Sequence, residues 1–562
     1  MNTLVRKPLT RWLAIAVVAV IGTGLALFFL NRPGPEIPAV DLASMEPKVR
    51  TQLNFYRKAV TADPDSATAW SNLAQAFHAH DLFPQAVAAY AEAIAFQPGD
   101  YRWPYLAALA QAETSPQAAL PLFRQAISLQ PANAAVYINY GDVLLRLGQH
   151  AEAAQAYRQA LALDSGSSYA LYGLAQVALI DGEPGEATEL LERAQAIAPH
   201  HGEIYSLLAQ AYQRLGMEDQ ARRQAMLAGA WPDASRASDP VAQAMESLAV
   251  DSQATARRGV SLAKRGAFEG AEKAFREVLE IRPGNARDFA NLGGALAGQG
   301  RQKEALEAYR KGLEIDPSDV DTLNNIGLTF LQLGDFDRAG QYLGKALELD
   351  PGFAAALGNL GLLAEQQKRP DQAVEYFRQA LELNPGLLFA RNALASRLAL
   401  EGDIAGAVEQ WRLVLEINPD ELATIYNLAR TLAASGEHAE AIRLLRHGLE
   451  LAPNSSRLIA ALAWELATAP AENLRNGAEA LQMTRRLVSA YPNQPEMLDV
   501  VAAALAETGD FTNAVKVMER AVKLAGGNAQ ALALRLNTYR LGRPWRQPQV
   551  PAIKVSASPL DR

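Results

Sequence analysis

A proline recurs every 34 residues through much of this chain. The strict run is Pro283, Pro317, Pro351, Pro385, Pro419 and Pro453. Similar letters precede these prolines, such as KGLEID before Pro317 and KALELD before Pro351. Because proline cannot continue an α-helix and disfavours helix at the residue before it, each one marks the same helix end. A fixed period of this length predicts a repeat architecture in which each copy is one supersecondary unit.

Two positions in every copy are always small, which predicts close packing between helix backbones. The first position reads Ala74, Ala107, Gly141, Ala175, Ala209, Gly259, Gly293, Gly327, Gly361, Ala395, Ala429, Ala463 and Ala502. The second reads Ala86, Ala119, Ala153, Ala187, Ala221, Ala271, Ala305, Ala339, Ala373, Ala407, Ala441, Ala480 and Ala514. Between the two positions lies a turn, where we expect a left-handed residue to end the first helix. Nine units place glycine there: Gly148, Gly182, Gly216, Gly266, Gly300, Gly334, Gly402, Gly436 and Gly509.

The first unit carries a nearly complete family motif: Trp70, Leu73, Ala74, Phe77, Ala86, Tyr90 and Pro98. This pattern resembles the tetratricopeptide repeat family, and the resemblance covers residues 50–528. It implies an all-α, right-handed superhelical solenoid of helix-turn-helix repeats. In that family the first helix of each pair lines the inner surface.

Departures from the period define the expected organisation. We expect a first lobe at 49–235 with an N-terminal capping helix and five repeats, a joint at 236–251, and a second lobe at 252–528 with eight repeats. A capping helix at 529–541 and an irregular tail at 542–562 follow. Capping elements are expected because end repeats otherwise expose an apolar face.

An uncharged apolar run at 12–30 precedes the repeats. Its 19 residues are long enough to cross the hydrocarbon core of a membrane. Arg6, Lys7 and Arg11 lie before it and Arg32 alone follows closely, which predicts a cytoplasmic N-terminus at 1–11. We therefore expect a single-pass anchor in the inner membrane, a proline-rich spacer at 31–48 and extracytoplasmic repeats. The rival interpretation of the run is a cleaved signal peptide.

Composition and motifs argue against most chemistry. The chain has no cysteine, which excludes disulfides and thiolate sites, and its net charge of −8 disfavours nucleic acid as a partner. No phosphate-binding loop, dinucleotide fingerprint or hydrolase nucleophile motif occurs, and the histidines, expected on the surface or in turns, lack metal-ligand spacing. Only 31–48 separates the anchor from the repeats, and only 529–562 follows the last repeat. We therefore expect no catalytic domain, and we expect no catalytic residue, cofactor or metal.

In six units, asparagine stands two residues before the first small position. The family resemblance places this asparagine on the inner surface. These candidate partner-binding residues are Asn72, Asn139, Asn291, Asn325, Asn359 and Asn427. An asparagine side chain offers both a donor and an acceptor, so a row of them can hold the backbone of an extended peptide. The rival interpretation is that asparagine serves a local structural role at this position.

The sequence thus predicts a non-catalytic, membrane-anchored bacterial scaffold of the cell envelope. It would bind a protein or an extended peptide in the concave groove, contact the lipid bilayer through 12–30, and act in assembly, secretion, cytochrome maturation or polymer export. Two alternatives stay open: a structural protein that self-assembles, and an accessory subunit of an envelope enzyme.

Overall fold

The computed structural model describes residues 35–231 and 239–549. The described part is built from α-helices and three short 3₁₀ helices, and it divides into two compact units. Unit 1 holds 35–224 and 239–301, and unit 2 holds 225–231 and 302–549. The anchor expected at 12–30 lies outside the described residues. In 35–231 and 239–549, no helix has the length and apolar character needed to span a bilayer.

Unit 1 begins with η1 (Leu42–Ser44) and a single helix, α2 (Pro47–Ala62). Its helices continue as α3 (Ala67–Ala79), α4 (Phe83–Phe96), α5 (Arg102–Thr114), α6 (Pro116–Leu129), α7 (Ala134–Arg146), α8 (His150–Leu163), α9 (Ser168–Ile180), α10 (Pro184–Ile197) and α11 (Gly202–Arg214). Helix α12 (Glu218–Ala230) starts in unit 1 and ends in residues assigned to unit 2. After the undescribed 232–238 come α13 (Pro240–Glu246), α14 (Ser252–Lys264), α15 (Phe268–Ile281) and α16 (Ala286–Gly298).

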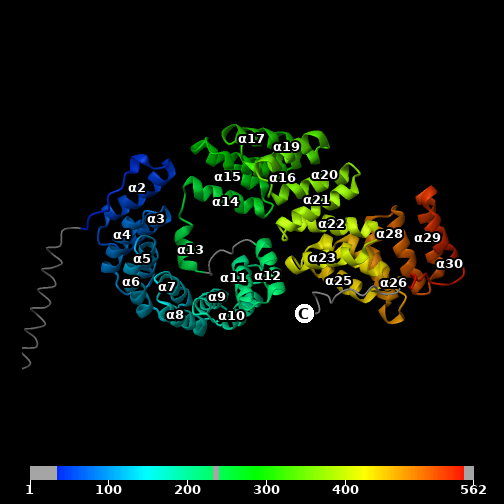
Figure 1. Cartoon of the computed structure of the whole chain (residues 1–562), viewed down its shortest axis with the longest axis horizontal. Helices are drawn as coiled ribbons and strands as arrows, with labels where there is room; N and C mark the ends of the chain where they lie inside the picture. The colour runs from blue at the N-terminus through cyan, green and yellow to red at the C-terminus, as the bar shows by residue number, and fades with distance from the viewer. Residues whose placement is uncertain (1–34, 232–238, 550–562) are drawn as a thin grey trace, which may run out of the picture. The chain divides into compact units, whose positions relative to one another are not determined.

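Unit 2 continues the same succession of helix pairs (Figure 1). Its helices are α17 (Gln302–Ile315), α18 (Val320–Gln332), α19 (Phe336–Leu349), α20 (Ala354–Gln366), α21 (Pro370–Leu383), α22 (Leu388–Glu401), α23 (Ile404–Ile417), α24 (Leu422–Ala434), α25 (His438–Leu451), α26 (Ser456–Thr468), η2 (Glu472–Leu474), α27 (Gly477–Ala490), α28 (Pro495–Glu507), α29 (Phe511–Ala525), η3 (Gly526–Asn528) and α30 (Gln530–Arg540). The spacing from Ala441 to Ala480 is 39 residues, and η2 lies in the part of the twelfth unit that holds the five extra residues.

The small positions of the repeat are packed as the sequence predicts. Of the second-site alanines, all except the half-buried Ala221 have no exposed surface. At the first site, a Cβ added to Gly361 would lie 2.4 Å from Phe377 Cε1, and one added to Gly327 would lie 2.7 Å from Leu343 Cγ. Such distances are far below ordinary carbon–carbon contact, so only glycine fits these positions without movement of the neighbour.

All nine predicted turn glycines have positive φ angles, between 73° and 90°. The two remaining units with a tight turn place Asp81 (φ 58°) and Lys368 (φ 60°) in the same left-handed conformation. Sequence patterns had assigned no role to these two residues. The turn geometry is therefore common to the repeats even where the residue is not glycine.

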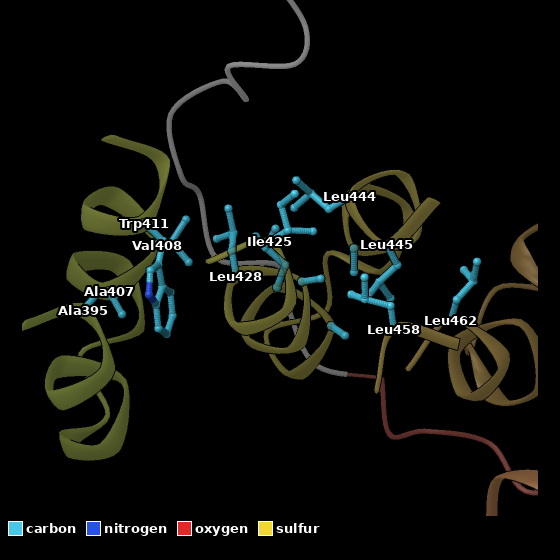
Figure 2. Packing of buried hydrophobic residues seen from close by; sticks show 14 of the residues in the cluster. Ala395, Ala407, Val408, Trp411, Ile425, Leu428, Leu444, Leu445, Leu458 and Leu462 are labelled. Carbon is cyan, nitrogen blue, oxygen red and sulfur yellow. The ribbon is translucent and has the colours of Figure 1, made fainter. Parts of the chain in front are cut away.

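The core of each unit is a succession of interlocking contacts between neighbouring pairs. In unit 2, one cluster runs from Leu357 on α20 to Ala504 on α28. Figure 2 shows a part of it, in which Trp411 on α23 faces Ala407 and Ala395, and Leu428, Leu445 and Leu458 join the next helices. No single pair could bury these side chains alone, which explains why the fold needs several copies.

The caps are present, but the segment predicted as a joint behaves differently from a simple linker. Helices α2 and α30 lie at the ends that the sequence predicts for the caps. Helix α13, within the predicted joint at 236–251, packs against α3 and α5 of unit 1. The compact units divide after Gln224 and again after Arg301, and the lobe boundary predicted at 251/252 falls inside unit 1.

Candidate partner-binding surfaces

The six candidate asparagines all lie on first helices of their pairs. Unit 1 contains Asn72 on α3, Asn139 on α7 and Asn291 on α16, and unit 2 contains Asn325 on α18, Asn359 on α20 and Asn427 on α24. Their surroundings differ. Asn72 is exposed, whereas Asn139, Asn291, Asn325 and Asn427 are half-buried and Asn359 is buried. Shared position in the repeat therefore does not give them one role.

Asn359 has a structural role. Its side chain is 4% exposed and donates a hydrogen bond of 2.8 Å to Oδ1 of Asn324 on the preceding first helix. Asn324 is itself buried. A buried amide pair of this kind stabilises the interface between two repeats, because each group would otherwise lack a partner. Asn359 is consequently unsuited to bind a peptide without rearrangement.

Asn139 takes part in a contact with another segment of the chain. It donates a hydrogen bond of 2.8 Å to the hydroxyl of Tyr105 on α5 and one of 2.9 Å to the carbonyl of Ala135. The Tyr105 hydroxyl donates in turn to Oδ2 of Asp239, the residue before α13. Burial, followed by the charge of Asp239, raises the pKa of Tyr105 well above its usual value, so the hydroxyl stays protonated and able to donate.

Helix α13 is fixed on unit 1 by the carboxylate of Asp239 and by two apolar side chains, Val241 and Met245. Oδ1 of Asp239 accepts from the backbone N–H groups of Val241 and Ala242 at 3.1 Å each, which caps the helix. Met245 is buried in the cluster that contains Trp70 and Trp103. In Figure 1, α13 lies on the inner side of the succession of first helices that includes α3 and α5.

The residues after α13 hold a second set of contacts. Gln52 on α2 donates to the carbonyl of Leu248 at 2.8 Å, and its Oε1 lies 2.7 Å from Nε2 of His80. Nδ1 of His80 lies 3.1 Å from Oδ2 of Asp251, the cap of α14. The backbone N–H of Ser252 donates to Glu46 at 2.7 Å. The segment Asp239–Ser252, named here the inner segment, thus lies along α2, α3 and α5 through specific polar contacts.

Unit 2 presents a cationic cluster on two neighbouring first helices. The guanidinium of Arg430 on α24 lies 5.5 Å from the ring centroid of Tyr426, and that of Arg457 on α26 lies 5.2 Å from the same ring. Both arginines are exposed, and neither forms an ion pair within 35–231 or 239–549. Asn427 follows Tyr426 on the same helix. Two available guanidiniums beside an aromatic ring and an amide form a surface suited to a carboxylate.

The sequence signal for this cluster was incomplete. Arg457 lies 31 residues after Tyr426, a spacing that joins successive first helices in a 34-residue repeat. A comparison of equivalent positions in neighbouring repeats, in place of positions within one repeat, would have identified Arg457 as a neighbour of Tyr426.

Some histidines differ from the expectation of surface or turn positions. His78 on α3 is 7% exposed, and burial lowers its pKa to about 4. His438 and Glu465 are both buried, with His438 Nδ1 2.7 Å from Glu465 Oε2. Gln547 of the tail donates to Glu465 Oε1 at 2.9 Å. These groups belong to packing contacts, and the described residues contain no group of three or more His, Cys, Asp or Glu side chains suited to a metal ion.

The succession of helix pairs and the polar contacts on their first helices define the class of protein: a helical repeat protein. Family models support the tetratricopeptide repeat family for this chain. Models described as "Tetratricopeptide repeat" match 54–101, 236–286, 324–387 and 398–465, and one described as "TPR repeat" matches 293–334. The middle TPR-like domain of cilia and flagella-associated protein 70 matches 103–228.

Similarity to individual proteins is partial. A human protein named O-mannosyl-transferase TMTC3 is 38% identical over 81 residues, which cover 14% of this chain and 9% of that protein. Pseudomonas aeruginosa pilF is similar in structure with 27% identity and a TM-score of 0.32, covering 37% of this chain and 94% of that one. The Cut9 and Hcn1 hetero-tetramer of the APC/C gives 15% identity and a TM-score of 0.42, covering 86% and 99% of the respective chains.

Proposed function

We propose that this tetratricopeptide repeat protein is a non-catalytic scaffold that binds an acidic peptide segment of a partner protein on the inner face of unit 2. The observation that carries the proposal is the cluster of Tyr426, Asn427, Arg430 and Arg457. Both guanidiniums lie close to the Tyr426 ring, and neither forms an ion pair with a carboxylate of the described residues. Tetratricopeptide repeat proteins generally bind protein partners, which supports a peptide as the ligand.

The chemistry of the cluster indicates how a ligand would be held. Each guanidinium can donate two parallel hydrogen bonds to a carboxylate, and the cation–π contacts with Tyr426 restrict the two arginine side chains before binding. The amide of Asn427 can donate to a peptide carbonyl and accept from a peptide N–H. We therefore propose an extended peptide with an acidic side chain or a terminal carboxylate.

The test uses the full chain in detergent and an array of acidic, neutral and basic peptides. Acidic peptides should bind, and Arg430→Ala with Arg457→Ala should weaken them at least tenfold, since each charge-assisted hydrogen bond contributes about 1.5–3 kcal/mol. The matched control is Arg310→Ala with Arg378→Ala, which removes the same charge from exposed positions on second helices. Equal losses in both double variants would show a general charge effect and refute the site.

The proposed location is the extracytoplasmic side of the inner membrane of a bacterium, with the chain held by residues 12–30. Its support is the uncharged run and the excess of arginine and lysine before it. The transferase activity named for the human relative is not carried over to this chain, because the match covers 9% of that relative.

Cysteine labelling tests the location cleanly, because the chain has no cysteine of its own. Single cysteines at Ser44 and Ser556 should react with a membrane-impermeant maleimide in intact spheroplasts, and the protein should resist an alkaline wash. Labelling only after lysis would reverse the topology. Release of a shortened chain would show that the first segment is a cleaved signal peptide.

A further inference from the structure

The inner segment resembles a bound ligand more than a repeat helix. Helix α13 has seven residues and buries one of them, Met245, whereas α3 and α5 bury eight each. A helix this short is not stable on its own in water. Its conformation therefore depends on the surface of unit 1 that it covers.

The contacts of α13 form a simple recognition pattern. Asp239 supplies the helix cap and meets the Tyr105 hydroxyl, which Asn139 positions. Val241 and Met245 are four residues apart, so they lie on one face of the helix and reach the apolar clusters of unit 1. The surface thus recognises three features of the helix: the acidic cap Asp239, the branched apolar Val241 two positions later, and the long apolar Met245 four positions after that.

The face of α13 that points away from unit 1 is exposed. Gln243, Ala244, Glu246 and Ser247 are exposed. Trp103 belongs to the same cluster as Met245, and its buried indole N–H has no hydrogen-bond acceptor in the described chain. A buried donor without an acceptor is costly, so the polar groups of the cluster that holds Met245 are not all satisfied.

We propose that the inner face of unit 1 around Tyr105, Asn139 and Trp103 is a binding site for a short, acid-capped amphipathic helix of a partner protein, and that the inner segment occupies it as a tethered competitor. The inference goes beyond the proposed function, because it concerns a different surface and a helical ligand. A tethered competitor lowers the apparent affinity for an outside ligand in proportion to the fraction of molecules in which the site is open.

The test uses the full chain and a fluorescein-labelled peptide with the sequence of residues 239–252. Asp239→Ala with Met245→Ser weakens the attachment of the inner segment, so this opened chain should bind the peptide at least tenfold more tightly than the unaltered chain. Adding Tyr105→Phe to the opened chain should reduce binding severalfold, and a peptide that carries the Asp239→Ala change should show the same loss. Equal weak binding by opened and unaltered chains would overturn the proposal.

A second measurement keeps the test decisive if the opened chain is unstable. Hydrogen exchange of the unaltered chain should show residues 239–252 opening at least 100-fold more readily than α3 and α5. Exchange of all three in one cooperative step would show that the inner segment is a fixed part of the core and would refute the proposal. Arg430→Ala with Arg457→Ala should leave binding of the 239–252 peptide unchanged, so the failure of either site is distinguishable from the failure of the other.

Discussion

Replacing Gly361 with alanine should destabilise the middle of unit 2. The added Cβ would lie 2.4 Å from Cε1 and 2.6 Å from Cδ1 of Phe377, a ring with no exposed surface. Normal carbon–carbon contact is about 3.5–4.0 Å, so the ring or the helix must move by about 1 Å. Overpacking of this kind costs about 1–3 kcal/mol, and alanine regains about 0.5–1 kcal/mol of helix stability relative to glycine. Because an approach of 2.4 Å is severe, the cost lies in the upper part of the first range, and the net loss expected is about 1–2 kcal/mol.

The assay should report locally, because long repeat arrays do not unfold in one step. Hydrogen exchange of α20 and α21 should quicken by a factor of about 5–30, the equivalent of that free energy. The control is Gly344→Ala on α19, where no heavy atom lies within 4 Å of the added Cβ. That variant should become more stable by about 0.5–1 kcal/mol. If α20 and α21 of the Gly361→Ala chain exchange hydrogen as slowly as in the unaltered chain, the claim that close packing requires glycine at this position is refuted.

Three further outcomes follow from the described contacts. Lys368→Gly should raise the thermal midpoint of unit 2 by relieving a left-handed lysine, with a gain of about 0.5–1 kcal/mol, and a fall would contradict the strain argument. Asn359→Ala should cost about 1–3 kcal/mol by leaving Asn324 without its partner, whereas Asn325→Ala should cost much less in the same urea titration. Because burial lowers the pKa of His78 to about 4, the folded state binds fewer protons than the unfolded chain below pH 6.5. Unit 1 should therefore lose up to about 3 kcal/mol between pH 6.5 and pH 4, and His78→Leu should flatten that part of the stability profile.

The repeat itself was predictable because its constraints are local and periodic. A small residue at Ala373 or Gly361, a left-handed turn at Gly334 and a proline two residues beyond α19 each follow from the geometry of one helix pair. Repetition multiplies the same weak signal, so the pattern specified the helix pairs with few errors. Asp81 and Lys368 were missed because the turn conformation is required there while the usual residue is absent.

The candidate surfaces were less predictable because they depend on contacts between repeats or between distant segments. The pairing of Asn359 with Asn324 turns an expected ligand residue into a structural one. Tyr105 and Asp239 are 134 residues apart, and no periodic rule connects them. The sequence identified 236–251 as a departure from the repeat, yet it held no sign that this departure would fold back onto α3 and α5.

Alanine at the second small position of every repeat has a consequence for how such a chain can change over generations. Ala339, Ala373 and Ala407 occupy equivalent fully buried positions 34 residues apart. Removal of residues 352–385 would join the end of α19 to the start of α22 and present the same kind of interface at the junction. Unequal recombination within the gene could therefore add or remove whole helix pairs without requiring a new core. The span of the inner surface could lengthen or shorten in fixed steps to suit a different partner, while surfaces that occur once, such as the Tyr426 cluster, would be carried along intact.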